Sequence, residues 1–173
     1  MKKGLFLLVG GIILIVSIFL ISFYSWNFFN KRKPNVDLNT LEIVLSDEGS
    51  VNLENQTPVD DTTGKAITPY LFKVINKSDV KAKYQLLIED YVSDASTELL
   101  SRNYLKYELK QDGIIVKTGN LSEISNNILD ENTISSKEEK KYELRIWVNE
   151  TVQADNWVGK SYNYNIKVNP IVN

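Results

Sequence analysis

Alternation of apolar and polar residues is the feature that most constrains the fold of this chain. It is clearest between Val80 and Glu89, where every second side chain is apolar: Val80, Ala82, Tyr84, Leu86 and Ile88. Successive side chains of a β-strand point to opposite faces of the sheet, so this pattern predicts a strand with one buried face. The polar residues between them, such as Lys81 and Lys83, would then face solvent.

The same period of two recurs through most of the chain after Thr40. Further inward-facing sets are expected within residues 41–45, 51–53, 70–74, 105–109, 142–148 and 162–168. Gln111-Asp112-Gly113 predicts a hairpin turn, because glycine accepts the left-handed conformation, and Ile114 to Thr118 would be the return strand. About seven to eight short strands separated by turns predict an all-β fold, an antiparallel, immunoglobulin-like β-sandwich.

Two segments lack this alternation. In the first, Ser93 to Asn103, either Asp94 or Ser96 is a suitable N-cap for a short helix through residues 98–100. The second, Leu121 to Glu138, is mostly polar, and its apolar residues are scattered: Ile124, Ile128, Leu129 and Ile134. The sequence predicts no regular strand there.

The N-terminal part has a different character. The run from Leu5 to Tyr24 has no charged residue, and its only polar side chains are Ser17, Ser22 and the Tyr24 hydroxyl. About 20 apolar residues are what an α-helix needs to cross the hydrocarbon core of a membrane. We therefore expect a transmembrane or signal-anchor helix in residues 1–29, a linker in residues 30–39 and one domain in residues 40–173.

The expected orientation places the domain outside the cell. Lys2 and Lys3 precede the apolar run and Lys31-Arg32-Lys33 follows it, so the basic residues near the two ends almost balance. The signal-like position of the run favours an internal N-terminus and a single-pass protein of the cell membrane. Cleavage near the small residue Ser25 would instead release the domain as a secreted protein.

Composition argues against several classes of function. The chain has neither Cys nor His, which removes thiol chemistry, the commonest general base and the commonest metal ligand. Asp60-Asp61 and Glu89-Asp90 follow no catalytic or metal-ligand spacing and are interpreted as solvated acids. All 22 acidic residues follow Pro34, so the domain is acidic and unsuited to binding nucleic acid. We expect no catalytic residue, no metal and no cofactor.

Aromatic residues are the candidates for partner binding. Trp147 lies on the face opposite Tyr142, Leu144 and Ile146 in its expected strand, which indicates either an exposed recognition residue or packing in the core or at a sheet edge. The other candidates are aromatic residues of the last loop and the last strand: Trp157, Tyr162 and Tyr164.

Part of the chain resembles the TasA/camelysin family. Ser50-Val51-Asn52-Leu53, with Pro58 and Asp60, is similar to the family's V-x-L…L-x-P-G-D stretch, and Tyr70 to Ser78 is similar to its F-x-F-x-N-x-G strand and turn. Ile21 to Trp26 resembles the end of the family's signal segment. The resemblance implies a secreted bacterial β-sandwich that builds fibres by passing a strand between subunits. It implies no peptidase activity, because no catalytic motif is matched.

These features predict a non-enzymatic bacterial surface or extracellular protein that acts through protein–protein association. Strand addition at an open sheet edge is the expected mechanism, through the segments Tyr162 to Asn169 and Thr40 to Leu45. The alternative is a membrane-tethered binding module, an accessory subunit of an envelope or secretion complex that recognises a protein or a glycan through its aromatic residues.

Overall fold

The computed structural model of the 173-residue chain describes residues 17–18, 20–26, 42–46, 50–53, 56–91 and 98–171. Residues 1–36 and 37–173 form two separate units. In the first unit, residues 17–18 and 20–26 are helical. Within the described residues, no helix has both the length and the hydropathy to cross a membrane. Most of the run from Leu5 to Tyr24 lies outside them, so the transmembrane helix stays a prediction.

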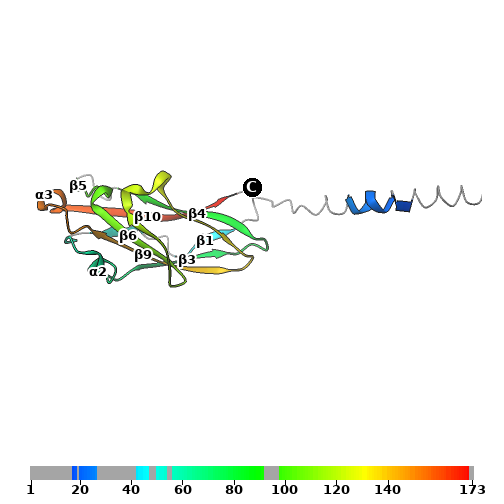
Figure 1. The fold of residues 1–173 in the computed structure, drawn as a ribbon, viewed down its shortest axis with the longest axis horizontal. Coiled ribbons are helices and arrows are strands. Elements are labelled where there is room, and N and C mark those ends of the chain that lie inside the picture. Colours follow the sequence, from blue (N-terminus) through cyan, green and yellow to red (C-terminus); the bar gives the residue numbers. More distant parts are fainter. Residues whose placement is uncertain are drawn as a thin grey trace, which may run out of the picture. The chain divides into compact units, whose positions relative to one another are not determined.

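The second unit is all-β, as predicted, and consists of two five-stranded sheets (Figure 1). Sheet A has the order β1-β3-β9-β6-β7, with strands β1 (Ile43–Leu45), β3 (Tyr70–Asn76), β9 (Glu139–Val148), β6 (Leu105–Gln111) and β7 (Ile114–Asn120). Sheet B has the order β2-β10-β4-β8, with strands β2 (Ser50–Leu53), β10 (Lys160–Ile171), β4 (Ala82–Asp90) and β8 (Ile128–Ile134). Strand β5 (Glu98–Leu99) pairs with β10 in parallel, whereas the other strand pairs are antiparallel.

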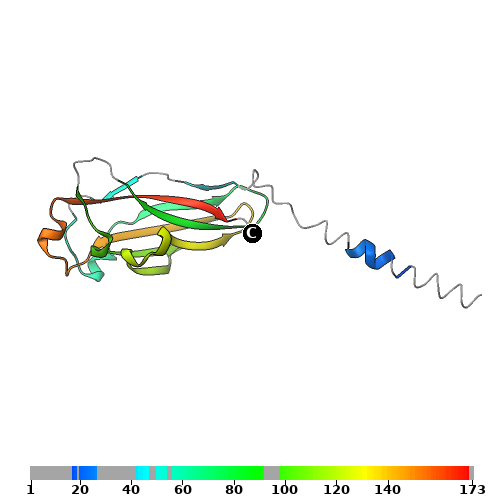
Figure 2. The same ribbon diagram turned by 90° about the horizontal axis from the view of Figure 1, so that it is seen from above.

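Short helical turns connect the strands. They are α2 (Asp61–Gly64), α3 (Ala154–Trp157) and the 3-10 turns η2 (Arg102–Tyr104), η3 (Leu121–Glu123) and η4 (Ser125–Asn127). The α3 turn lies at one end of the sheets (Figures 1 and 2). The hairpin between β6 and β7 turns through Asp112 and Gly113 with φ of 50° and 82°, which confirms the turn predicted from the sequence.

The two sheets pack face to face, and the alternating apolar residues form the core between them. The predicted inward faces of β4, β6, β9 and β10 are buried, as are Phe72 and Val74 of β3, except that Val168 of β10 is only partly buried. Aromatic contacts join the layers: the rings of Tyr70 in β3 and Tyr164 in β10 meet edge to face at 6.4 Å. A period of two in the sequence therefore predicted these strands and their buried sides correctly.

Two sequence predictions about the irregular segments are wrong. Residues 98 and 99 are not helical: they form β5, whose neighbour Leu100 donates its backbone N–H to Ser161 O at 2.7 Å. The polar segment Leu121 to Glu138 contains a full strand, β8, whose register places Asp130 and Asn132 opposite the inward-facing Leu86 and Tyr84. Tertiary pairing overrides the local pattern in both cases.

The loop before β3 covers part of the outer face of sheet A. Asp60 caps α2 by accepting the Thr63 N–H at 2.8 Å, and the hydrogen bond lowers the pKa of the Asp60 carboxyl. Gly64 packs on the indole of Trp147 so closely that an added Cβ would lie 2.5 Å from the ring atom Cδ1. Trp147 therefore points away from the core of the sandwich and is nevertheless only 2% exposed.

We predict that Gly64→Ala destabilises the domain by about 1–3 kcal/mol, because the new methyl group overpacks the contact between α2 and Trp147. Thermal unfolding of the full chain followed by circular dichroism measures the change. Thr62→Ala is the matched control, since Thr62 lies in the same turn and is exposed. Equal stability of the two variants would contradict the close packing described here.

Candidate functional site

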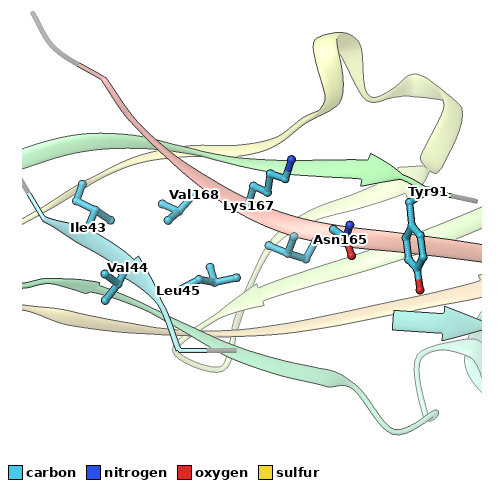
Figure 3. A pocket seen from close by; sticks show the side chains of 8 residues that line it. Ile43, Val44, Leu45, Tyr91, Asn165, Lys167 and Val168 are labelled. Atoms are coloured by element: carbon cyan, nitrogen blue, oxygen red, sulfur yellow. The ribbon is translucent and has the colours of Figure 1, made fainter. Parts of the chain in front are cut away.

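A groove of about 630 Å³ lies along the open side of the sandwich, between β1 of sheet A and β10 of sheet B. Its lining residues are Ile43, Val44, Leu45, Tyr91, Asn165, Ile166, Lys167 and Val168. In Figure 3, Ile43 and Leu45 project from β1 towards Val168 of β10, and Tyr91 stands at one end. The strand segments expected from the sequence for association, Thr40 to Leu45 and Tyr162 to Asn169, thus contribute most of the lining.

The groove follows the part of β10 that is paired on one side only. Strand β4 pairs with β10 from Tyr164 to Ile171, whereas β2 covers the opposite side only from Tyr162 to Asn165. Beyond Asn165, no residue that the structure describes pairs with β10 on the β2 side. Two strands that belong to different sheets, β1 and β10, therefore border a stretch of β10 that has no partner strand on this side among the described residues.

The hydrogen bonds between β10 and β4 show which backbone groups of β10 face the groove. Tyr91 donates its N–H to Asn163 O at 3.1 Å, so the odd-numbered residues of β10 point their backbone groups towards the β4 side. Backbone groups of successive residues alternate between the two sides of a strand. The N–H and C=O groups of Ile166 and Val168 consequently face the groove.

Pro170 fits this arrangement. It lies opposite Tyr84 in the register of β10 and β4, at an even position whose N–H would have faced the β2 side. Proline has no N–H to donate and is found in sheets mainly on edges. The pairing of β10 with β4 therefore loses no hydrogen bond at this position.

Among the described residues that line the groove, Lys167 alone has a side chain charged at neutral pH. Its amine forms an ion pair with Glu89 Oε2 at 2.6 Å. Ile43, Leu45 and Ile166 present aliphatic side chains and are nearly covered by their neighbours. Such a lining can bury apolar side chains and pair with an extended backbone.

A polar network closes the opposite side of the sandwich. The hydroxyl groups of Tyr84 and Tyr142 lie 2.5 Å apart across the sheets. The Tyr142 hydroxyl lies 3.2 Å from Gln111 Oε1 and 3.3 Å from Asp130 Oδ2. Asn132 donates to the same Gln111 oxygen at 2.6 Å. Because both ends of the network are anchored on strands, it holds the two sheets together.

Burial changes the acidity of these phenols. Burial raises the pKa of Tyr84 to about 12, a shift that the hydrogen bond with Tyr142 partly opposes. Burial also raises the pKa of Tyr142, Tyr162 and Tyr164. The folded domain therefore favours neutral tyrosines, and their ionisation opposes folding.

The aromatic residues that the sequence suggested for partner binding are mostly inside the protein. Tyr162 and Tyr164 are 1% exposed and belong to the core, where their rings stack at 5.6 Å. Trp147 is covered by α2, and Trp157 is partly buried against the core. Trp147, Tyr162 and Tyr164 therefore expose almost no surface to a partner, whereas Trp157 keeps part of its surface exposed, and its role in partner binding stays a prediction. Sequence periodicity alone could not reveal that α2 covers Trp147.

The acidic pairs considered in the sequence have local partners. The Asp61 carboxylate accepts a hydrogen bond from Lys106 Nζ at 2.8 Å, which lowers the pKa of Asp61. Asp90 accepts hydrogen bonds from Arg102 and from the Tyr162 hydroxyl, the latter at 2.6 Å. These contacts connect loops and strands. Tyr91, next in the chain, lines the groove although no sequence pattern singled it out.

Comparison with known proteins adds no family assignment. No protein-family model matches the chain, and no curated protein matches it.

We predict that the domain loses stability as the pH rises from about 10 through about 12. The unfolded-state pKa of tyrosine is about 10, and that of folded Tyr84 is raised to about 12. The stabilisation from the neutral phenol is therefore complete below the unfolded value and is lost as pH passes the folded value. Tyr84→Phe should lessen this pH dependence in denaturant titrations of the full chain. An unchanged dependence would contradict the contribution assigned to Tyr84.

Proposed function

We propose that this chain is a non-enzymatic protein-association domain at the bacterial cell surface, and that an extended segment of a partner protein adds as a strand along β10. The observation that carries the proposal is the groove between β1 and β10, where backbone groups of Ile166 and Val168 are presented beside apolar side chains. Main-chain hydrogen bonds to such an edge provide affinity, and pockets for alternate side chains provide specificity.

The chemistry of the groove favours an extended peptide over a compact ligand. The stretch of β10 from Ile166 to Ile171 has no partner on the β2 side among the described residues, and β1 lies on the other side of the groove. A strand lying there would continue the pairing that β2 makes as far as Asn165. Its alternate side chains would lie beside Val168, which is only partly buried, so that apolar residues at every second position are expected in the partner segment.

The proposed location rests on the N-terminal sequence. The uncharged run from Leu5 to Tyr24 would anchor or export the chain, and the acidic domain after Pro34 would lie outside the membrane. Retention of this run gives a single-pass membrane protein, whereas cleavage near Ser25 gives a secreted one. Both forms would present the same groove outside the cell.

The finer architecture is part of the proposal. We infer an immunoglobulin-like sandwich similar to that of the TasA/camelysin family. Its support is the order of strands in the two sheets together with the motifs at residues 50–60 and 70–78. An assembled matrix or fibre is the function that this resemblance favours.

A labelling experiment in intact cells tests the location and the groove together. The chain has no native cysteine, so Lys167→Cys introduces one thiol at the groove, and Val158→Cys introduces an exposed thiol on the turn after α3. A membrane-impermeant maleimide that carries a photocrosslinker should label both full-length variants. Illumination should then give a protein adduct for Lys167→Cys only, with mass spectrometry identifying the second chain.

The labelling result tests the location of the domain, and the crosslinking result tests the groove. Absence of labelling at both positions would contradict an external domain. Labelling at both positions with equal crosslinking would contradict the groove as the association site. An adduct with a second copy of the chain would indicate self-assembly, and an adduct with another protein would indicate a partner complex.

A further inference from the structure

Strand β7 is an uncovered apolar edge that the proposed groove does not involve. It is the last strand of sheet A and pairs with β6 on one side, and no strand in the described part of the chain pairs with its other side. The first three residues of β7 are apolar and exposed: Ile114 to 71%, Ile115 to 53% and Val116 to 39%. Exposure of three consecutive apolar side chains means that neither face of the strand is covered at this point.

Such an edge calls for an explanation, because proteins usually protect exposed edges with charges, proline or short strands. Ile114 to Val116 contains neither a charge nor a proline. One protective device is present: the register of β7 against β6 shifts between Leu109 and Lys110, which makes Val116 an extra residue and bends the strand there. A partner strand would therefore form only a short ladder around Ile114 and Ile115.

We propose that the β7 strands of two copies of this chain pair antiparallel about a twofold axis and join their A sheets. The charges at the two ends of the apolar run select this partner and this direction. Asp112 precedes the run and Lys117 follows it. Antiparallel pairing places the acidic start of each strand beside the basic end of the other, whereas parallel pairing would align like charges.

The two charged residues are suitably placed for this role. The Asp112 carboxylate is held in the turn because it accepts the Lys141 backbone N–H at 3.1 Å. Lys117 forms no ion pair with any other residue that the structure describes. The Lys117 amine is thus available to an acid on a second molecule.

Pairing at β7 is compatible with an occupied groove. Strands β1 and β7 form the two opposite edges of sheet A, so one molecule could use both surfaces at once. The contact is short, and small protein interfaces are usually weak and transient. We therefore expect association that depends on concentration, as in a crowded membrane or matrix.

Single cysteines in the full chain test the proposal, because the native sequence contains none. A residue on the twofold axis faces its own copy at a Cα separation of about 4.5–5.5 Å, which lies within the disulfide range of about 4.4–6.8 Å. For each residue further from the axis, the same residue in the two copies lies about 7 Å further apart along the strands, which is twice the rise per residue. Disulfide formation should consequently be sharply position-dependent.

Cysteines at positions 114 to 118 are compared one at a time under mild oxidation of the full chain in its native membrane. We expect the dimer yield to peak at one position between Ile114 and Val116 and to fall at least fivefold by Thr118. Leu71→Cys is the control, since Leu71 is 62% exposed on β3, away from β7. A flat profile, or a yield no higher than that of the control, would overturn antiparallel pairing of β7.

A charge variant tests the direction of pairing independently. Adding Lys117→Glu to the cysteine variant with the highest yield should reduce that yield several-fold, because the new carboxylate would lie beside Asp112 of the other copy. Lys117→Arg should preserve the yield. Equal yields from these two charge variants would overturn the charge pairing. Lys167→Cys labelling reports on the groove alone, so it distinguishes failure of the proposed function from failure of β7 pairing.

Discussion

One strand, β10, holds sheet B together. It pairs with β2 and β5 and, over eight residues from Tyr164 to Ile171, with β4, and within the described residues no other strand connects β2 to β4. Its inward side chains, Tyr162, Tyr164 and Ile166, form the centre of the core. The same strand carries the uncovered stretch beside the groove. Because β4 and the core already fix its conformation, this stretch is prepared for pairing without reorganisation, which lowers the entropic cost of adding a partner strand.

The two long sides of the sandwich are closed by different means. On the side of β8, buried polar groups of Tyr84, Tyr142 and Asp130 connect the sheets through hydrogen bonds. On the side of β1 and β10, aliphatic side chains line a groove beside a part of β10 that has no partner strand among the described residues. A buried polar network fixes one arrangement of the two sheets, because each hydrogen bond needs its partner in place. An apolar groove can accept different extended segments. This difference favours the addition of a partner strand on the side of β1 and β10.

Sequence periodicity predicted the strands whose inward side chains are all apolar. It failed for β8, where inward polar side chains have hydrogen-bond partners across the core. Asp130 and Asn132 face inward in β8 and interrupt the apolar alternation, because Tyr142 and Gln111 satisfy them. For Trp147 the outward position followed from the sequence, but the cover that α2 provides through Gly64 did not. The strand segments of the groove followed from the sequence, but their meeting across two sheets depends on long-range pairing that a local pattern does not encode.

Amide hydrogen exchange along β10 tests the central claim most directly. In the dilute full chain in detergent, the amides of Tyr162 and Tyr164, which face β2, should exchange more slowly than those of Ile166 and Val168, which face the groove. In native membranes, where the proposed partner strand would add to β10, the amides of Ile166 and Val168 should become protected. Slow exchange of all four amides in the dilute chain, or no gain of protection in membranes, would contradict strand addition at β10.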